Sequence, residues 1–336
     1  MESSGGSGSR LCNSRFAIVD GTSQGSNRSS DLIYFWIIFN LFALGMLWLD
    51  LQVFHRGGRV RPRQAVALSA MWVGLAAAFA VVVFFWQGRQ VAIEFITGYV
   101  LELSLSVDNL FLFLVIFRYF AVPEEQQHRV LFWGIIGALV MRAIFIIAGI
   151  GLIQRFHWIL YGLGALLIYS GIRLAFAGEH QVDPSRNPAV KALRRFLPVT
   201  DTYEGGRFFI RNWQGKAGLY ATPLLIVLAV IETTDLLFAV DSIPAILAIT
   251  LNAFIVYASN VFAIMGLRSM FFAVSGLMKL FRFLHTGLAA ILILVGAKMI
   301  VADYFRVPTL AMLGAVAGIL TISVAASILI PEKERT

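Results

Sequence analysis

Six carboxylates lie inside stretches of the sequence that are long and apolar enough to span a membrane. They are Glu94, Glu102, Asp108, Glu232, Asp235 and Asp241. A charged side chain at the centre of a bilayer costs about 2.5–3.5 kcal/mol even on the lenient insertion scale. Such a group persists when it is paired, protonated or bound to an ion. A functional role is therefore the first interpretation of this set.

Structural interpretations stay open for some of these charges. Glu94 lies near the outer end of its apolar stretch, where it can equally well be exposed to water or buried in the membrane. Asp50 closes the first apolar stretch beside basic residues and is interpreted as interfacial. Arg142 and Arg268 also fall inside apolar stretches. These two arginines are possible charge partners that would balance the acids as structural ion pairs.

The spacing of the acids predicts an irregular backbone. Glu102 and Asp108 are six residues apart, which separates them by about 120° around an ideal helix. Asp235 and Asp241 have the same spacing, whereas Glu232 shares a helix face with Asp235. For both acids of a pair to reach one ion, the helix should unwind between them. Side chains that can satisfy freed backbone groups lie nearby: Ser104, Ser106, Asn109, Thr233, Thr234 and Ser242, with Pro244 shortly after. We therefore predict broken helices at both acidic motifs, facing each other across a pseudo-two-fold axis.

The ligand chemistry of the two motifs is all oxygen. Neither motif contains His or Cys, which would suit zinc or copper, whereas carboxylate, carbonyl and water suit manganese, calcium or magnesium. Several carboxylates also suit a multivalent cation better than sodium. The same groups carry protons, so exchange of a metal for protons is natural. The predicted metal-binding residues are Glu102, Asp108, Asn109, Glu232, Asp235, Asp241 and Ser242.

The composition identifies the elements that must position these residues. Hydrophobic residues make up 59% of the 336 residues and charged residues 14%, and the mean hydropathy is +0.79. A soluble domain is typically about 45–50% apolar and about 25% charged, so a soluble globular protein is excluded. Nine apolar stretches predict an all-α polytopic membrane protein, with spans at 32–51, 65–86, 91–117, 130–150, 158–177, 219–249, 254–274, 285–302 and 307–330.

The basic residues set the predicted orientation. With the N-terminus outside, seventeen Lys and Arg residues fall on the cytoplasmic side and six outside, which favours N-out and C-in. The net charge of +8 then reflects cytoplasmic loops and not nucleic-acid binding. Outside the spans lie a polar tail (1–31), a long basic cytoplasmic loop (178–218), and a cytoplasmic tail (331–336) after the final span in 303–330. The single cysteine, Cys12, excludes an internal disulfide.

An internal repeat relates the third to fifth spans to the sixth to eighth. Glu102 to Asn109 reads ELSLSVDN, and Asp235 to Ser242 reads DLLFAVDS, at an offset of 133 residues. Arg142 and Arg268 head similar runs at an offset of 126 in the next spans, and GIR and GAK match at an offset of 125 in the third pair (Gly171–Arg173 and Gly296–Lys298). Because each unit has three spans, the second copy must run in the opposite direction. An inverted repeat of this kind is typical of secondary transporters.

At these motifs the chain resembles the TerC/Alx family of integral membrane proteins. The resemblance rests on GYVLELSLSVDNLF (98–111), ETTDLLFAVDSIPAI (232–246) and SNVFAIMGLRSMF (259–271), and it extends over roughly residues 33–330. It implies an integral membrane protein linked by name to tellurite resistance, and to manganese export under alkaline or metal stress. The family's acidic positions fall on the metal-binding residues predicted above. Because carboxylates repel an oxyanion, we interpret any effect on tellurite as indirect.

Three functions compete on this reading. The leading one is alternating-access export of Mn²⁺ (with Ca²⁺ or Mg²⁺ as alternatives) from a bacterial inner membrane, with proton antiport as one way to drive it. This function predicts no enzyme activity, no tightly bound cofactor and no nucleic-acid partner; its partners are the bilayer, the metal ion and protons. The alternative is a membrane-protein assembly or insertion factor in which the acids are structural. An intramembrane aspartyl protease is disfavoured because no G-x-G-D motif accompanies the acids.

Overall fold

The computed structural model describes most of the chain between residues 36 and 329. Described are residues 36–49, 62–156, 158–176, 190, 191, 193, 195, 197–200, 202, 203, 205–213, 216–274, 283–305 and 307–329. The side chain of Asp108 is outside this set, although its backbone is included. The predicted polar tail at 1–31, most of the first half of the 178–218 loop and the predicted tail at 331–336 also lie outside the described residues.

The chain divides into two units, Met1–Asp50 and Leu51–Thr336. The first unit contains one apolar helix, Trp36–Leu49, in its described part. The remaining residues of the predicted span at 32–51 are outside the described ranges.

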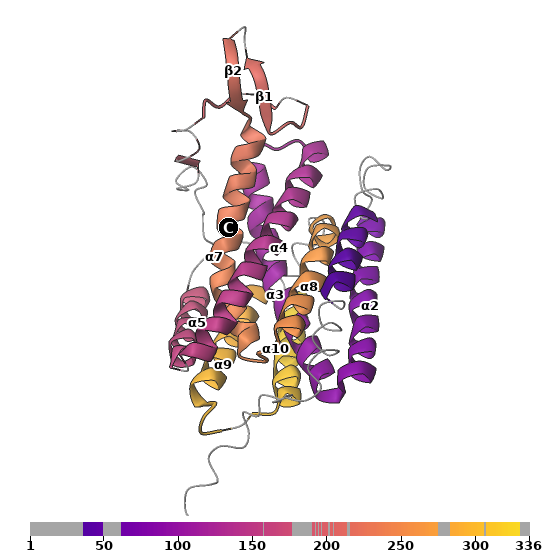
Figure 1. The fold of residues 1–336 in the computed structure, drawn as a ribbon, viewed down its shortest axis with the longest axis vertical. Coiled ribbons are helices and arrows are strands. Elements are labelled where there is room, and N and C mark those ends of the chain that lie inside the picture. The colour runs from indigo at the N-terminus through magenta and orange to yellow at the C-terminus, as the bar shows by residue number, and fades with distance from the viewer. Residues whose placement is uncertain are drawn as a thin grey trace, which may run out of the picture. The chain divides into compact units, whose positions relative to one another are not determined.

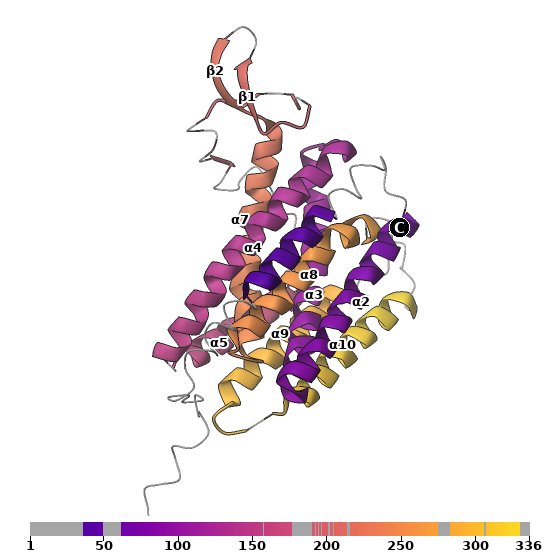
Figure 2. The same cartoon turned by 45° about the vertical axis from the view of Figure 1, so that its right-hand side comes forward.

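The second unit contains eight described helices that are long and apolar enough to cross a membrane. They are α2 (Pro62–Gln87), α3 (Arg89–Tyr119), α4 (Glu124–Arg155), α5 (Ile159–Phe176), α7 (Pro223–Leu247), α8 (Ala253–Val274), α9 (Leu284–Val301) and α10 (Thr309–Leu329). This confirms the predicted fold class, an all-α polytopic membrane protein. Figures 1 and 2 show the long helices α4 and α7 running side by side.

Several helix contacts within the second unit form pairs that the predicted repeat would relate to each other. If α3, α4 and α5 are exchanged with α7, α8 and α9, the contact of α3 with α8 becomes that of α7 with α4. The contact of α5 with α7 likewise becomes that of α9 with α3, and the α3–α7, α4–α8 and α5–α9 contacts map onto themselves. The α4–α5 and α7–α9 contacts are not matched in this way, and the repeat stays a prediction. The orientation of each unit in the membrane stays a prediction.

Helices α5 and α9 pack backbone against backbone through small residues. A methyl group added to Gly164 would lie 2.9 Å from the carbonyl oxygen of Gly296, and one added to Gly296 would lie 2.6 Å from that of Gly164. One added to Gly171 would lie 2.8 Å from the carbonyl oxygen of Ala289. At an offset of 125, the Gly171–Ala289 contact is the repeat counterpart of the Gly164–Gly296 contact. Small residues permit this close approach in membrane helices.

Replacing Gly171 with alanine should destabilise the protein, because its new methyl group meets backbone atoms that cannot move independently. We expect a loss of about 1–3 kcal/mol, the usual cost of overpacking. Thermal unfolding in detergent would measure it. Gly162→Ala on the same helix is the matched control: nothing lies within 4 Å of its added methyl, so it should be neutral or stabilising by up to about 1 kcal/mol. Equal melting temperatures for the two variants would contradict the close packing.

The predicted breaks at the acidic motifs are wrong, because α3 and α7 continue as helices through both motifs. The nearby hydroxyls bond within the intact helix instead of replacing broken backbone bonds. Ser104 donates to the carbonyl of Val100 (2.6 Å), and Thr234 donates to that of Val230 (2.7 Å). Pro244 is accommodated inside α7. Asp235 and Asp241 therefore stay on different faces of α7.

The second half of the predicted cytoplasmic loop is partly ordered, and the predicted span at 219–249 begins too early. Strands β1 (Phe209–Trp213) and β2 (Lys216–Ala221) form an antiparallel hairpin that leads into α7 at Pro223 (Figure 1). The Tyr203 hydroxyl donates to the Phe120 carbonyl (2.6 Å), and Arg129 donates to the Gly206 carbonyl (3.1 Å). This segment is thus held against the connection between α3 and α4. Burial raises the pKa of Tyr203 to about 12.

Candidate functional site

Two of the predicted acids meet at one buried arginine. Arg142 of α4 is 2% exposed and forms an ion pair with Glu102 of α3, which is fully buried. Its other terminal nitrogen lies 3.7 Å from Oδ1 of Asp235 on α7. The guanidinium also donates to the side-chain oxygen of Asn260 on α8 at 2.7 Å. Four helices, α3, α4, α7 and α8, thus converge on a single guanidinium group.

This group of four, which we term the central cluster (Glu102, Arg142, Asp235 and Asn260), retains unused acceptors. Oε1 of Glu102 and Oδ2 of Asp235 are buried and accept no hydrogen bond from the described residues. A buried carboxylate oxygen without a partner is costly, and in native proteins such an atom usually has a role to explain it. The cluster therefore has capacity for a further positive ligand or proton.

A small cavity adjoins the central cluster. Its polar lining comes from Ser106, Arg142, Asp235 and Arg268, and the rest of the lining is apolar. It has room for about one water or one ion. The cavity places both predicted charge partners, Arg142 and Arg268, beside Asp235.

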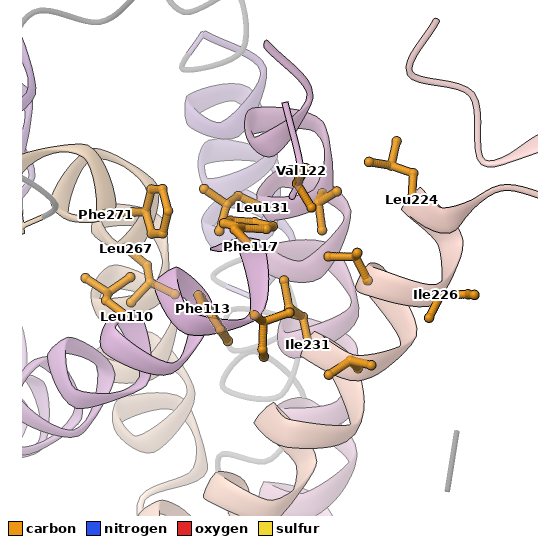
Figure 3. Close-up of a cluster of buried hydrophobic side chains, with 14 of the residues drawn as sticks. Leu110, Phe113, Phe117, Val122, Leu131, Leu224, Ile226, Ile231, Leu267 and Phe271 are labelled. Atoms are coloured by element: carbon orange, nitrogen blue, oxygen red, sulfur yellow. The ribbon is translucent and has the colours of Figure 1, made fainter. Parts of the chain in front are cut away.

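Apolar side chains close the cluster along the helices in both directions. Figure 3 shows one buried group in which Phe113, Leu131 and Ile231 lie between α3, α4 and α7. On the other side of the cluster Ile146 of α4 packs with Ala239 and Ile243 of α7. Glu102 and Asp235 thus have packed apolar side chains on both sides along the helices.

Glu232 lies one turn from Asp235 on α7 and is half-buried. Its carboxylate rests where a side chain at Gly137 of α4 would stand: a methyl group there would lie 2.0 Å from Oε1. Glu232 makes no hydrogen bond or ion pair with the described residues. It shares the face of Asp235, as its spacing predicts, but does not join the central cluster.

Replacing Gly137 with alanine should move the Glu232 carboxylate without removing its charge. The displaced atoms are the end of a flexible side chain, so we expect the melting temperature to change little. Mn²⁺ binding should weaken several-fold if the position of Glu232 matters. Gly151→Ala on the same helix, with open space around it, is the control. Unchanged binding in both variants would remove Glu232 from the site.

Asp241 lies elsewhere on α7, in a half-buried environment of its own. Its Oδ1 accepts a hydrogen bond from Ser170 of α5 at 2.7 Å. Arg173, one turn further along α5, is exposed and lies within electrostatic reach of Asp241. Ser242, next to it, is buried and its hydroxyl has no partner among the described side chains and backbone. Asp241 therefore belongs to a second polar position, separate from the central cluster.

The seven predicted metal-binding residues are therefore only partly brought together. Glu102 and Asp235 meet, Asn109 is buried on α3, and Glu232, Asp241 and Ser242 lie apart from the pair. The Asp108 side chain falls outside the described atoms. Within the described part of the chain, no group of three or more His, Cys, Asp or Glu side chains is placed to hold a metal ion. The metal-binding role of these seven residues stays a prediction. In this conformation Arg142 lies between two of them, Glu102 and Asp235.

Sequence reasoning missed Asn260 and Ser170, which hold Arg142 and Asp241 in place. Asn260 carried a signal, because an amide in an otherwise apolar span needs a partner. Ser170 carried none, since a serine in a membrane helix usually bonds its own backbone. Glu94, left open between a wet and a buried position, accepts an exposed hydrogen bond from Gln90 at 3.1 Å.

Comparison with known proteins gives one family and several bacterial relatives. A model of the family described as "Integral membrane protein TerC family" matches residues 87–335. An uncharacterized membrane protein of Myxococcus xanthus is 44% identical over 295 residues, covering 88% of this chain and 92% of its own. The Escherichia coli K12 protein named "Putative membrane-bound redox modulator Alx" is 44% identical over 299 residues, covering 86% and 92%. A Rickettsia bellii membrane protein is 37% identical over 295 residues, covering 88% and 97%. No solved structure matches the chain.

Proposed function

This chain belongs to the TerC family of integral membrane proteins, and from that premise we propose that it exports a divalent metal cation, Mn²⁺ first, by alternating access. The observation that carries the proposal is the central cluster. Glu102 comes from the first predicted repeat unit and Asp235 from the second, and both are buried beside Arg142. Secondary transporters bind their ions at such a junction between inverted repeats.

The choice of cation follows from the donor atoms. Carboxylates and amides are hard oxygen ligands, which suit manganese, calcium and magnesium and not the softer metals. Mn²⁺ ranks first because of the family resemblance, with Ca²⁺ and Mg²⁺ as alternatives. A divalent ion at the central cluster would neutralise Glu102 and Asp235 together. Glu232 and Asp241, one to two turns away on α7, would then be further positions at which the ion binds during its passage.

The remaining features of the proposal concern place and coupling. We place the protein in a bacterial inner membrane with the N-terminus outside, because its relatives are bacterial and its basic residues favour that orientation. After release of the metal, the transporter must return to its starting conformation with the charge of its carboxylates neutralised. Either protons, which the carboxylates accept, or a positive charge of the protein itself can do this. The proposal involves no enzymatic step and no bound cofactor. The redox role in the name of the Alx relatives has no dithiol counterpart here, because the chain has one cysteine.

The proposal is tested by transport into vesicles. Purified protein is reconstituted in liposomes, and uptake of Mn²⁺, Ca²⁺ and Mg²⁺ is followed with metal-sensitive dyes. We expect saturable transport that prefers Mn²⁺. Vesicles carrying Asp235→Asn should transport no more than empty liposomes, and vesicles carrying Glu125→Gln, an exposed acid at the start of α4, should match the wild type. Equal fluxes in all four preparations would reject transport and leave the assembly factor as the better function.

A further inference from the structure

We propose that Arg142 is an internal counter-cation: it occupies Glu102 and Asp235 while the carrier is empty and leaves them when Mn²⁺ binds. The inference rests on the proposed function and specifies how the empty carrier returns. It assigns the return step to a side chain of the protein, so that net export of Mn²⁺ needs no proton moving in the other direction.

The contacts of Arg142 support this role. Its guanidinium joins Glu102 of its own repeat unit to Asp235 of the other, so it stands between the carboxylates where a shared cation would stand. Each carboxylate gives Arg142 only one of its oxygens. Oε1 of Glu102 and Oδ2 of Asp235 have no partner among the described residues. These two oxygens are the positions at which an incoming cation can begin to compete with the arginine.

Charge makes the two occupants exclude each other. The cavity beside the cluster holds about one water-sized particle. A divalent ion there would be within a few ångströms of the guanidinium in a medium of low dielectric, where like charges repel strongly. Mn²⁺ and Arg142 therefore compete for Glu102 and Asp235. With neither cation present, the empty transporter would have to pass through its closed conformation with two charged, buried carboxylates, which is unfavourable.

Asn260 gives Arg142 a second place to bind. Its side-chain oxygen accepts from the guanidinium at 2.7 Å without carrying a charge. When Mn²⁺ takes the carboxylates, this bond keeps one donor of the arginine satisfied. At the repeat offset of 126, the counterpart of Arg142 is Arg268, and the counterpart of Asn260 is Gly134. Glycine offers no side-chain acceptor, so the position related to Asn260 cannot serve Arg268 in the way that Asn260 serves Arg142.

The test separates exchange from net transport in the same vesicles. Exchange of labelled Mn²⁺ for unlabelled Mn²⁺ uses the loaded carrier only, whereas net Mn²⁺ efflux also needs the empty carrier to return. Arg142→Gln should bind Mn²⁺ at least about tenfold more tightly than the wild type. In the wild type Arg142 occupies the carboxylates most of the time, and in the variant they are always free to bind the metal. It should continue to exchange Mn²⁺ but lose most net efflux. Arg142→Lys, which keeps the charge, should recover part of the net efflux.

Two further variants make the result decisive. Asn260→Ala keeps the arginine but removes its second partner, so it should bind Mn²⁺ more weakly than the wild type, opposite to Arg142→Gln. Arg155→Gln, at the exposed end of the same helix, should behave as the wild type. Net efflux retained by Arg142→Gln, or weaker Mn²⁺ binding in both Arg142→Gln and Asn260→Ala, would overturn the inference and leave Arg142 a structural residue. If wild-type vesicles neither exchange nor export Mn²⁺, the proposed function itself fails.

Discussion

Glu102→Gln should lower the free energy of unfolding by about 3 kcal/mol, the lower end of the cost of breaking a buried ion pair. The variant keeps the shape of the side chain but leaves Arg142 with one carboxylate, Asp235, at 3.7 Å. A buried guanidinium without a full counter-charge is then retained in the core. Unfolding of the purified protein by heat or denaturing detergent measures the change. Glu125→Gln, on the exposed first turn of α4, should shift stability by less than about 0.5 kcal/mol.

A double-mutant cycle shows whether the loss belongs to the pair. Arg142→Gln alone leaves Glu102 and Asp235 buried without a cation, so it should also destabilise. The double variant Glu102→Gln and Arg142→Gln removes both charges and should be more stable than the sum of the single effects predicts. Residues in contact commonly couple by about 0.5–3 kcal/mol. Strictly additive losses would mean that the two side chains do not depend on each other, contrary to the contact in the structure.

The membrane spans could be predicted from composition because the constraint is physical. A backbone in hydrocarbon must satisfy its own hydrogen bonds, so each long apolar stretch becomes a helix. The prediction of 91–117 and the observed α3 at Arg89–Tyr119 differ by two residues at each end. The described part of the first predicted span, Trp36–Leu49, is helical as well. The hairpin before α7 was missed because short strands in a polar loop have no apolar run to mark them.

The course of the helix through the acidic motifs could not be predicted from residue types. Ser104, Thr233 and Thr234 are equally able to satisfy a broken backbone and to bond an intact one. In the structure they donate to carbonyls four residues back. Spacing predicted which acids share a face of α7, but not that Arg142 would take the position expected for an ion. That choice depends on how four helices are rotated against each other, which a single sequence does not specify.

Asp241→Asn should abolish net Mn²⁺ efflux while the protein stays folded. Asn has nearly the same shape, and its amide oxygen can still accept the 2.7 Å hydrogen bond from Ser170. Removal of the charge should weaken Mn²⁺ binding on that part of the path by at least about 10–100-fold, the cost of lesser changes around metal sites. Efflux from vesicles and the melting temperature, measured on the same preparation, give the two halves of the result.

Ser170→Ala is the matched control, because it removes the hydrogen bond and keeps the carboxylate. One such bond contributes about 1 kcal/mol, so efflux should fall several-fold at most. If Ser170→Ala and Asp241→Asn were equally inactive, the position of the side chain and not its charge would be what matters. Normal efflux in Asp241→Asn would take Asp241 off the path.

The repeat relation extends this prediction to the other half of the protein. Asp108 has the position on α3 that Asp241 has on α7, at an offset of 133 residues. If the two repeat units run in opposite directions, these acids lie on opposite sides of the central cluster. Each would then bind the ion on its route between the cluster and one face of the membrane. Asp108→Asn should then block net efflux as completely as Asp241→Asn does. A defect in one variant only would show that the two units do not contribute equally, because an alternating carrier needs both openings in every cycle.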